Sequence, residues 1–236
     1  MVILPLNLSG ASAHMRGKRL IGPIDLTIEA KGFTIVIGPN GSGKTTLLRL
    51  MHGLQRCSNG SVNWASSPEI ARQNQAFVFQ APIMMRRRVR DSLAYPLRLR
   101  GVPKAEALDK AEGCARRFGL ENLLNNWAPM LSGGEKQKLS LARALITEPE
   151  ILFLDEPCAN LDGAATREIE ALLQEVQQRG TRVVMSTHNM GQARRLAQEV
   201  VFMLKGNVHE YSQSTSFFAE PATPEAKAFL NGDIVE

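Results

Sequence analysis

The chain has few cysteines and no long apolar run. Its 236 residues include only Cys57, Cys114 and Cys158, which are odd in number and widely spaced. That spacing offers neither a metal-binding pattern nor a disulfide framework, and it is typical of a protein in a reducing compartment. Nowhere do 18 apolar residues follow one another, so the sequence predicts no membrane-spanning helix.

Three other signals are weak or missing. The opening residues, 1–6, lack the basic stretch of a secretory signal peptide, so none is expected. There is no internal repeat, which predicts a single unit and not a tandem pair. The net charge of +5 is compatible with a surface near anionic lipid, but it is too small an excess to indicate a nucleic-acid partner.

A glycine-rich loop is the first positive signal. The loop lies between an apolar, β-rich run at 33–37 and a run of good helix formers at 46–51, the context in which backbone N–H groups and a helix N-terminus face an anion. A glycine-rich turn after a strand is the plainer alternative, but such a turn has no need of Lys-Thr at the helix start. The loop fits the pattern G-x-x-x-x-G-K-[ST] and consists of Gly38, Pro39, Asn40, Gly41, Ser42, Gly43, Lys44 and Thr45.

In a loop of this kind the lysine and the hydroxyl have separate tasks. Lys44 would reach the β- and γ-phosphates of a nucleoside triphosphate, and Thr45 would place its hydroxyl on Mg²⁺. Thr46 follows in the first helical turn and is included among the predicted ATP-binding residues. This motif predicts nucleotide binding without saying what the nucleotide is used for.

A second helix start lies about 90 residues further on. Ser132-Gly133-Gly134-Glu135 precedes a helical pattern that runs to Leu145. Ser132 is predicted to be the N-cap and Glu135 its capping-box partner. A Gly-Gly helix start also exposes backbone donors and the positive end of the helix dipole, which favours an anion. The capping and anion-binding interpretations are compatible.

Polar residues follow three strand-like runs. Asp155 and Glu156 end the run at 151–154, Gln80 follows 76–79, and His188 follows 183–187. Ligands gather at the carboxyl ends of strands in open α/β sheets. Because neighbouring side chains of a strand point to opposite faces, the strand must end before both carboxylates can serve one site. Each residue alone also fits a plainer structural role, such as a solvated acidic turn.

Together, and in this order, these motifs resemble those of the ABC ATPases. The resemblance implies that Asp155 and Gln80 join Thr45 around Mg²⁺, that Gln80 senses the γ-phosphate, and that Glu156 is the general base. It also implies that His188 holds the attacking water, and that Asp162 in Asn160-Leu161-Asp162 communicates across a dimer. In the family each ATP lies between the phosphate loop of one chain and the Ser-Gly-Gly segment of the other, so the trans signature here is Ser132, Gly133, Gly134 and Glu135.

The resemblance also implies a fold. We expect one ABC ATPase domain over 1–236: an α/β P-loop NTPase core made of 1–80 and 149–236, with an N-terminal antiparallel β region and a helical subdomain inserted at 81–148 that carries the signature motif. Composition supports this division, because 81–148 is rich in helix formers and the flanking parts alternate between strand and helix patterns. The segment from Lys104 to Phe118 is predicted to be a surface helix, and a short helix is predicted at 225–230.

Two features set this chain apart within the resemblance. No aromatic residue lies where the family stacks a ring on adenine; that position falls near Met15, with His14 the only ring nearby. The segment 83–93 contains four arginines among residues 86–90. Docking of a membrane partner is the favoured interpretation of that segment, followed by a solvated basic turn and then by nucleic-acid binding.

The sequence therefore predicts the ATP-hydrolysing subunit of an ABC transporter that uses ATP and Mg²⁺. We expect an ATP-dependent homodimer at the cytoplasmic face of the plasma membrane, under a separate transmembrane permease and served indirectly by an extracytoplasmic solute-binding protein. The stretch from Phe79 to Gly101 and the segment 217–221 resemble importers of oxyanions such as tungstate, molybdate or phosphate. The alternatives are a soluble ABC ATPase of assembly or repair, and a nucleotide-gated binding module without catalysis.

Overall fold

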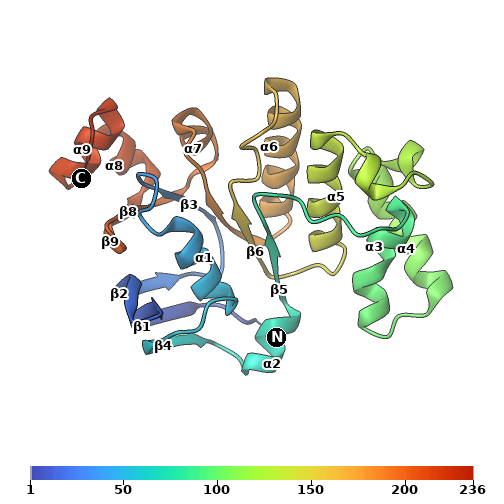
Figure 1. Cartoon of the computed structure of the whole chain (residues 1–236), viewed down its shortest axis with the longest axis horizontal. Helices are drawn as coiled ribbons and strands as arrows, with labels where there is room; N and C mark the ends of the chain where they lie inside the picture. The colour runs from blue at the N-terminus through green and yellow to red at the C-terminus, as the bar shows by residue number, and fades with distance from the viewer. Residues whose placement is uncertain (1, 236) are drawn as a thin grey trace.

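Two β-sheets organise the chain (Figure 1). The computed structural model describes residues 2–235. The larger sheet has six strands in the order β5-β6-β7-β3-β8-β9, parallel from β5 to β8 with β9 antiparallel at the edge. Its strands are β3 (Phe33–Ile37), β5 (Gln75–Val78), β6 (Ile151–Asp155), β7 (Arg182–Ser186), β8 (Glu199–Leu204) and β9 (Asn207–Gln213).

The smaller sheet is antiparallel, with the order β2-β1-β4. It is made of β1 (Leu6–Met15), β2 (Lys18–Ile28) and β4 (Asn59–Trp64). The predicted combination of an α/β core with an N-terminal antiparallel region is therefore confirmed.

The helix α1 (Lys44–His52) is packed between the two sheets (Figure 1). The central strands are buried on both faces, and their side chains alternate between two cores. In β3, Ile35 and Ile37 face the core shared with the larger helices, whereas Val36 faces the core that contains Leu47 and Leu50 of α1. This alternation fixes the register of β3 and therefore the place where the phosphate loop begins.

Helices connect the strands on either side of this arrangement. Lys104 begins α4 as predicted, and the predicted helix up to Leu145 is α5. The short helix α8 was not predicted, because its polar Ser-Thr-Ser start gives no helix signal. The helices are α2 (Pro68–Gln73), α3 (Val89–Leu99), α4 (Lys104–Arg117), α5 (Gly133–Leu145), α6 (Gly163–Gln178), α7 (Met190–Leu196), α8 (Ser214–Ala219) and α9 (Pro224–Asn231), with 3-10 turns at Glu121–Leu123 and Ala128–Met130.

The carboxyl ends of β3, β6 and β7 meet at one edge of the large sheet. In the ladder between β6 and β7, Asp155 is paired with Ser186, and Ser186 is paired with Val36 of β3. Parallel strands with this register deliver the loops that follow them to the same place. No helix in the described range, 2–235, is both long and apolar enough to cross a bilayer.

Candidate active site

The phosphate loop has the backbone that only glycines adopt easily. Gly38, Gly41 and Gly43 have φ values of 146°, 79° and 104°. A Cβ on Gly38 would lie 2.2 Å from the carbonyl oxygen of Met203, and one on Gly43 would lie 2.5 Å from Cγ2 of Ile21. Gly38 and Gly43 are thus required by space as well as by conformation, whereas Gly41 is required by its conformation alone.

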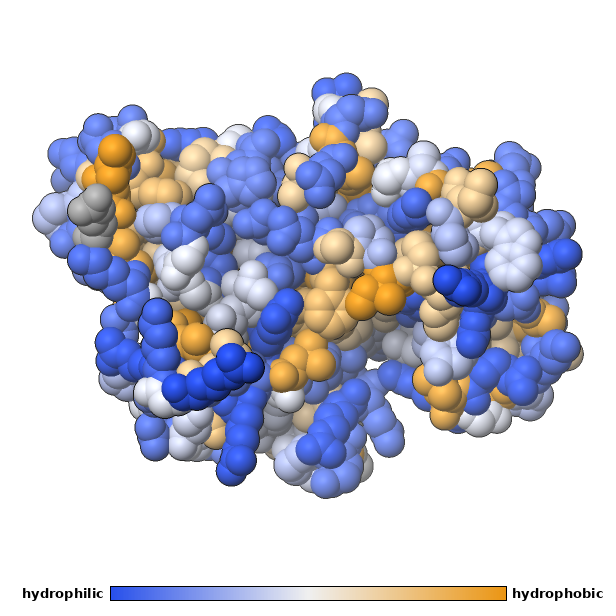
Figure 2. Space-filling view, in the orientation of Figure 1, coloured by the Kyte–Doolittle hydropathy of each residue, from blue (hydrophilic) through white to orange (hydrophobic). Residues whose placement is uncertain are grey.

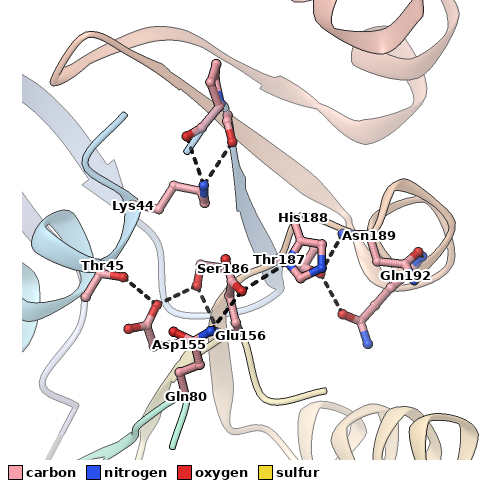
Figure 3. A network of polar contacts seen from close by, with 12 residues as sticks. Lys44, Thr45, Gln80, Asp155, Glu156, Ser186, Thr187, His188, Asn189 and Gln192 are labelled. Carbon is pink, nitrogen blue, oxygen red and sulfur yellow. Dashed lines mark hydrogen bonds and ion pairs between the residues drawn. The ribbon is translucent and has the colours of Figure 1, made fainter. Parts of the chain in front are cut away.

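Lys44 lies inside this loop, almost fully buried. Its Nζ donates to the carbonyl oxygens of Gly38 at 2.9 Å and Pro39 at 3.1 Å (Figure 3). Burial lowers the pKa of Lys44, and the carboxylates of Glu156 and Asp155 partly oppose that shift. The ammonium group is therefore held in a desolvated place, where an additional anionic ligand would interact with it strongly.

The start of α1 is uncapped. Its N-cap is Gly43, which offers no side chain to the first helical N–H groups, so these donors are available to an anion. The hydroxyl of Ser42 is buried and has no hydrogen-bond partner. Free donors, a buried ammonium and an unpartnered hydroxyl fit the phosphates of a nucleotide.

Three elements converge on Asp155. Thr45 of α1 donates to Oδ1 of Asp155 at 2.9 Å, and Ser186 at the end of β7 donates to the same atom at 2.8 Å (Figure 3). Sequence analysis missed Ser186. The only available signal was its place two residues before His188, at the end of an apolar strand.

Glu156 takes the left-handed conformation, with φ of 46°. Its N–H donates to the hydroxyl of Ser186 at 3.1 Å, which holds the turn. The strand ends at Asp155 and the next residue turns, so two adjacent carboxylates reach one site, as their spacing required.

The carboxylate of Glu156 meets two of the other predicted residues. Oε2 of Glu156 lies 3.0 Å from Nδ1 of His188 and 3.4 Å from Nε2 of Gln80 (Figure 3). A cavity of about 140 Å³ opens beside this cluster. The side chains predicted from three strand ends thus lie together. The cavity is lined by Glu156, Cys158, Ala159, Leu161, Thr166, Thr187, His188, Asn189 and Gln192.

The donor set also fits Mg²⁺. Thr45, Asp155 and Gln80 supply a hydroxyl, a carboxylate and an amide oxygen, the hard ligands that Mg²⁺ prefers, usually together with water and substrate phosphates. Within residues 2–235 no group of three or more His, Cys, Asp or Glu side chains is placed to hold a metal. Water and the phosphate oxygens of a bound nucleotide would complete the coordination.

The second helix start has the predicted capping box. Glu135 N donates to the hydroxyl of Ser132 at 3.4 Å, and Ser132 N donates to Oε2 of Glu135 at 2.8 Å. The hydrogen bond from the Ser132 backbone lowers the pKa of Glu135. Figure 1 shows α5 well away from α1, so one chain does not bring the signature motif to its own phosphate loop.

Two further predicted positions lie in ordinary surroundings. Asp162 is the N-cap of α6, where Oδ1 accepts from the N–H groups of Ala164 at 2.9 Å and Ala165 at 2.8 Å. Its role across a dimer stays a prediction. Met15, near the position predicted for adenine stacking, ends β1 and is 58% exposed.

Comparison with known proteins shows the family of this chain. The family model for the ABC transporter matches residues 21–159. The chain belongs to the ABC transporter family. It is 35% identical over 209 residues to the tungstate uptake system ATP-binding protein TupC of Peptoclostridium acidaminophilum, covering 88% of this chain and 98% of that protein. It is 33% identical over 240 residues to the methionine import ATP-binding protein MetN 2 of Bacillus licheniformis, covering 95% and 70%.

Solved structures agree with this assignment. CbiO1 of Clostridium perfringens, described as part of the ABC transporter complex CbiONQ, superposes with a TM-score of 0.83 at 26% identity over 97% of this chain and 95% of that one. The ATP-binding cassette MJ0796 superposes with a TM-score of 0.79 at 24% identity over 89% and 98%, a likeness of fold. The chain is an ATP-binding ABC ATPase with the ABC ATPase fold.

Proposed function

We propose that this ABC ATPase drives an importer as a head-to-tail, ATP-dependent homodimer. The observation that supports this most is the separation of two anion-ready helix starts, at Gly43 and at Ser132, within one chain. A two-fold dimer would bring each phosphate loop to the partner's signature motif, the isologous arrangement of a symmetric pair. Residues 1–236 then act as one ATPase domain, with 81–148 as its inserted helical subdomain.

Within this proposal the residues of the site have distinct roles. Lys44 and the first turn of α1, through Thr46, bind the β- and γ-phosphates of ATP. Glu156 accepts a proton from the attacking water, and His188, 3.0 Å away, orients that water and the γ-phosphate. Thr45, Gln80 and Asp155 would hold Mg²⁺, which when bound neutralises charge on the phosphate oxygens. Catalysis is then mainly positioning and charge stabilisation.

An apolar groove supports docking of a separate permease. A cavity of about 360 Å³ lies between the end of β5 and helices α3 and α5, and Figure 2 shows hydrophobic side chains gathered on that face. Ile83 at its rim is 61% exposed. The predicted docking segment 83–93 borders this groove, because Ile83 and Met85 line it. Arg87 of the same segment stacks over the ring of Tyr95. The ATPase would thus be peripheral to the inner face of the membrane, with any solute-binding protein acting on the permease.

The proposed cargo rests on similarity to a known transporter protein and not on any residue of this site. TupC is named for tungstate uptake, so we propose an inorganic oxyanion such as tungstate. The residues that would recognise such an oxyanion belong to the permease and the solute-binding protein. Uptake of tungstate by cells that carry the wild type or Glu156→Gln, measured as cell-associated tungsten, tests the cargo directly.

Co-purification from native membranes in mild detergent tests the transporter assignment. Wild type should bring down a polytopic membrane protein. Ile83→Asp should lose that protein while keeping basal phosphate release, and Ile234→Asp, at another exposed isoleucine (91% exposed), should keep both. Only soluble companions, from a preparation that still hydrolyses ATP, would favour the alternative of an ABC ATPase acting in assembly or repair.

A further inference from the structure

The loop that carries His188 depends on its anchors. The side chain of His188 is 59% exposed, so packing alone does not fix its direction. Its neighbour Thr187 is buried, 3% exposed, and the N–H of Thr187 donates to the carbonyl oxygen of Val36 at 3.2 Å. The orientation of the imidazole therefore depends on its contact with Glu156 and on what holds Thr187 and Asn189 on either side of it.

Thr187 is held through its hydroxyl as well. Oγ1 of Thr187 donates to Oε1 of Gln192 at 2.8 Å and accepts from the N–H of Asn189 at 3.1 Å (Figure 3). Asn189 in turn caps α7, because its Oδ1 accepts from the N–H of Gln192 at 3.0 Å. The residues before and after His188 are thus both tied to Gln192.

Gln192 is itself anchored to a second helix. Its Nε2 donates to Oε1 of Glu170 on α6 at 3.2 Å. Glu170 also receives two hydrogen bonds from Arg195, at 2.8 Å and 2.7 Å. Gln192 is 2% exposed and Glu170 6% exposed. The ion pair between Glu170 of α6 and Arg195 of α7 therefore fixes the side-chain amide of Gln192. That amide in turn anchors the loop that carries His188.

The donors and acceptors allow only one direction for this chain of bonds. The carboxylate of Glu170, paired with Arg195, is an acceptor only, so Gln192 must present its NH₂ group to it. The amide oxygen of Gln192 then faces Thr187, which must donate. The free lone pair of Thr187 accepts from Asn189 N–H. Reversing any member would place two acceptors or two donors against each other.

We propose that Gln192 and Glu170 are positioning residues for hydrolysis, acting through Thr187 to aim His188 at Glu156. The proposal rests on the proposed catalytic role of His188. Gln192 also lines the cavity beside Glu156, together with Cys158 of the loop after β6. An error of about 1 Å in such positioning reduces turnover by about a hundredfold.

Steady-state phosphate release by the full chain tests this inference. Gln192→Leu should lower kcat at least about tenfold and leave KM for ATP within about twofold. Gln192→Glu, which sets a second carboxylate against Glu170, should lose as much. Arg194→Gln, on α7 but outside the chain of bonds, is the matched control.

Two other comparisons keep the test decisive. Thr187→Val should lower kcat without changing KM, and Thr187→Ser should restore it, so this pair carries the test if Gln192→Leu fails to fold. Wild-type kcat in Gln192→Leu, or in Thr187→Val, would overturn the positioning role. If His188→Ala turns over normally, the role of His188 fails instead; if it is slow while Gln192→Leu is normal, only this inference fails.

Discussion

Nδ1 of His188 lies 3.0 Å from Oε2 of Glu156. The two residues come from loops that follow neighbouring strands, β7 and β6, so their contact depends on the sheet order and not on proximity in sequence. The arrangement leaves Nε2 of the imidazole free to face a ligand. A carboxylate and an imidazole at this distance can orient one water molecule between the protein and a phosphate.

Replacing Glu156 by Gln should separate ATP binding from hydrolysis. The amide keeps the shape of the side chain but cannot accept the proton, so kcat should fall by about 10² to 10⁴ while ATP affinity stays. ATP should then drive the variant to a dimer on gel filtration. Lys44→Ala is the opposite case, because it should lose nucleotide binding in a filter or calorimetric assay. Near-normal turnover by Glu156→Gln would remove Glu156 from the catalytic role.

Ser186→Ala should damage the site although no motif includes this serine. The change leaves Glu156 N–H with one acceptor fewer and removes a hydrogen bond to Asp155, which should reduce the free energy of unfolding by about 1–3 kcal/mol and kcat by about tenfold or more. Urea unfolding and phosphate release measure the two effects. Ser140→Ala is the matched control, because that buried hydroxyl has no partner; equal effects of the two substitutions would contradict the assignment.

Gly43→Ala and Gly53→Ala compare the two ends of α1. Both glycines are left-handed, with φ of 104° and 87°, so each alanine should destabilise the fold by about 1–2 kcal/mol. Only at Gly43 would the new Cβ strike a neighbour, Ile21 at 2.5 Å, whereas nothing lies within 4 Å at Gly53. Titration calorimetry should show at least about tenfold weaker ATP binding for Gly43→Ala alone. Equal affinities would mean that the loop tolerates a side chain.

His52 should make stability depend on pH. Burial lowers the pKa of His52 from 6.5 to about 4, and its ring meets Phe77 and Phe153 edge-on. Buried, neutral His52 contributes fully to the free energy of unfolding above pH 6.5, where the imidazole is neutral in both the folded and the unfolded state. As the pH falls towards 4, the unfolded chain takes up the proton first, and up to about 3 kcal/mol of stability is lost. His52→Phe should flatten that part of the urea-unfolding profile; an unchanged profile would contradict the argument.

Sequence reasoning was strongest where one local pattern carried the information. The β3–loop–α1 unit around Lys44 and the capping box at Ser132 were predicted with their residues, because glycine spacing and cap chemistry act over a few positions. The strand ends at Asp155 and His188 were predicted from the apolar runs before them, and the roles of these residues from the resemblance to the ABC ATPases.

The features of the site that the sequence did not predict depend on contacts between residues far apart in the chain. Ser186 bridges Asp155 and Glu156 only because β7 lies beside β6. The sequence of a short apolar strand does not predict which strand will be its neighbour in the sheet. The left-handed backbone of Glu156 and the link from Gln192 to Glu170 on another helix were hidden for the same reason. Here the topology, not the local sequence, brings the groups together.

The positive φ of Glu156 means that the side chain proposed for hydrolysis lowers the stability of the folded state at the same position. A side chain in this region of backbone space destabilises the folded state by about 1–2 kcal/mol relative to glycine. Selection for thermal tolerance alone would therefore favour Glu156→Gly, which should melt later and, under the role proposed for Glu156, lose most hydrolysis. The carboxylate stands there against the preference of its own backbone.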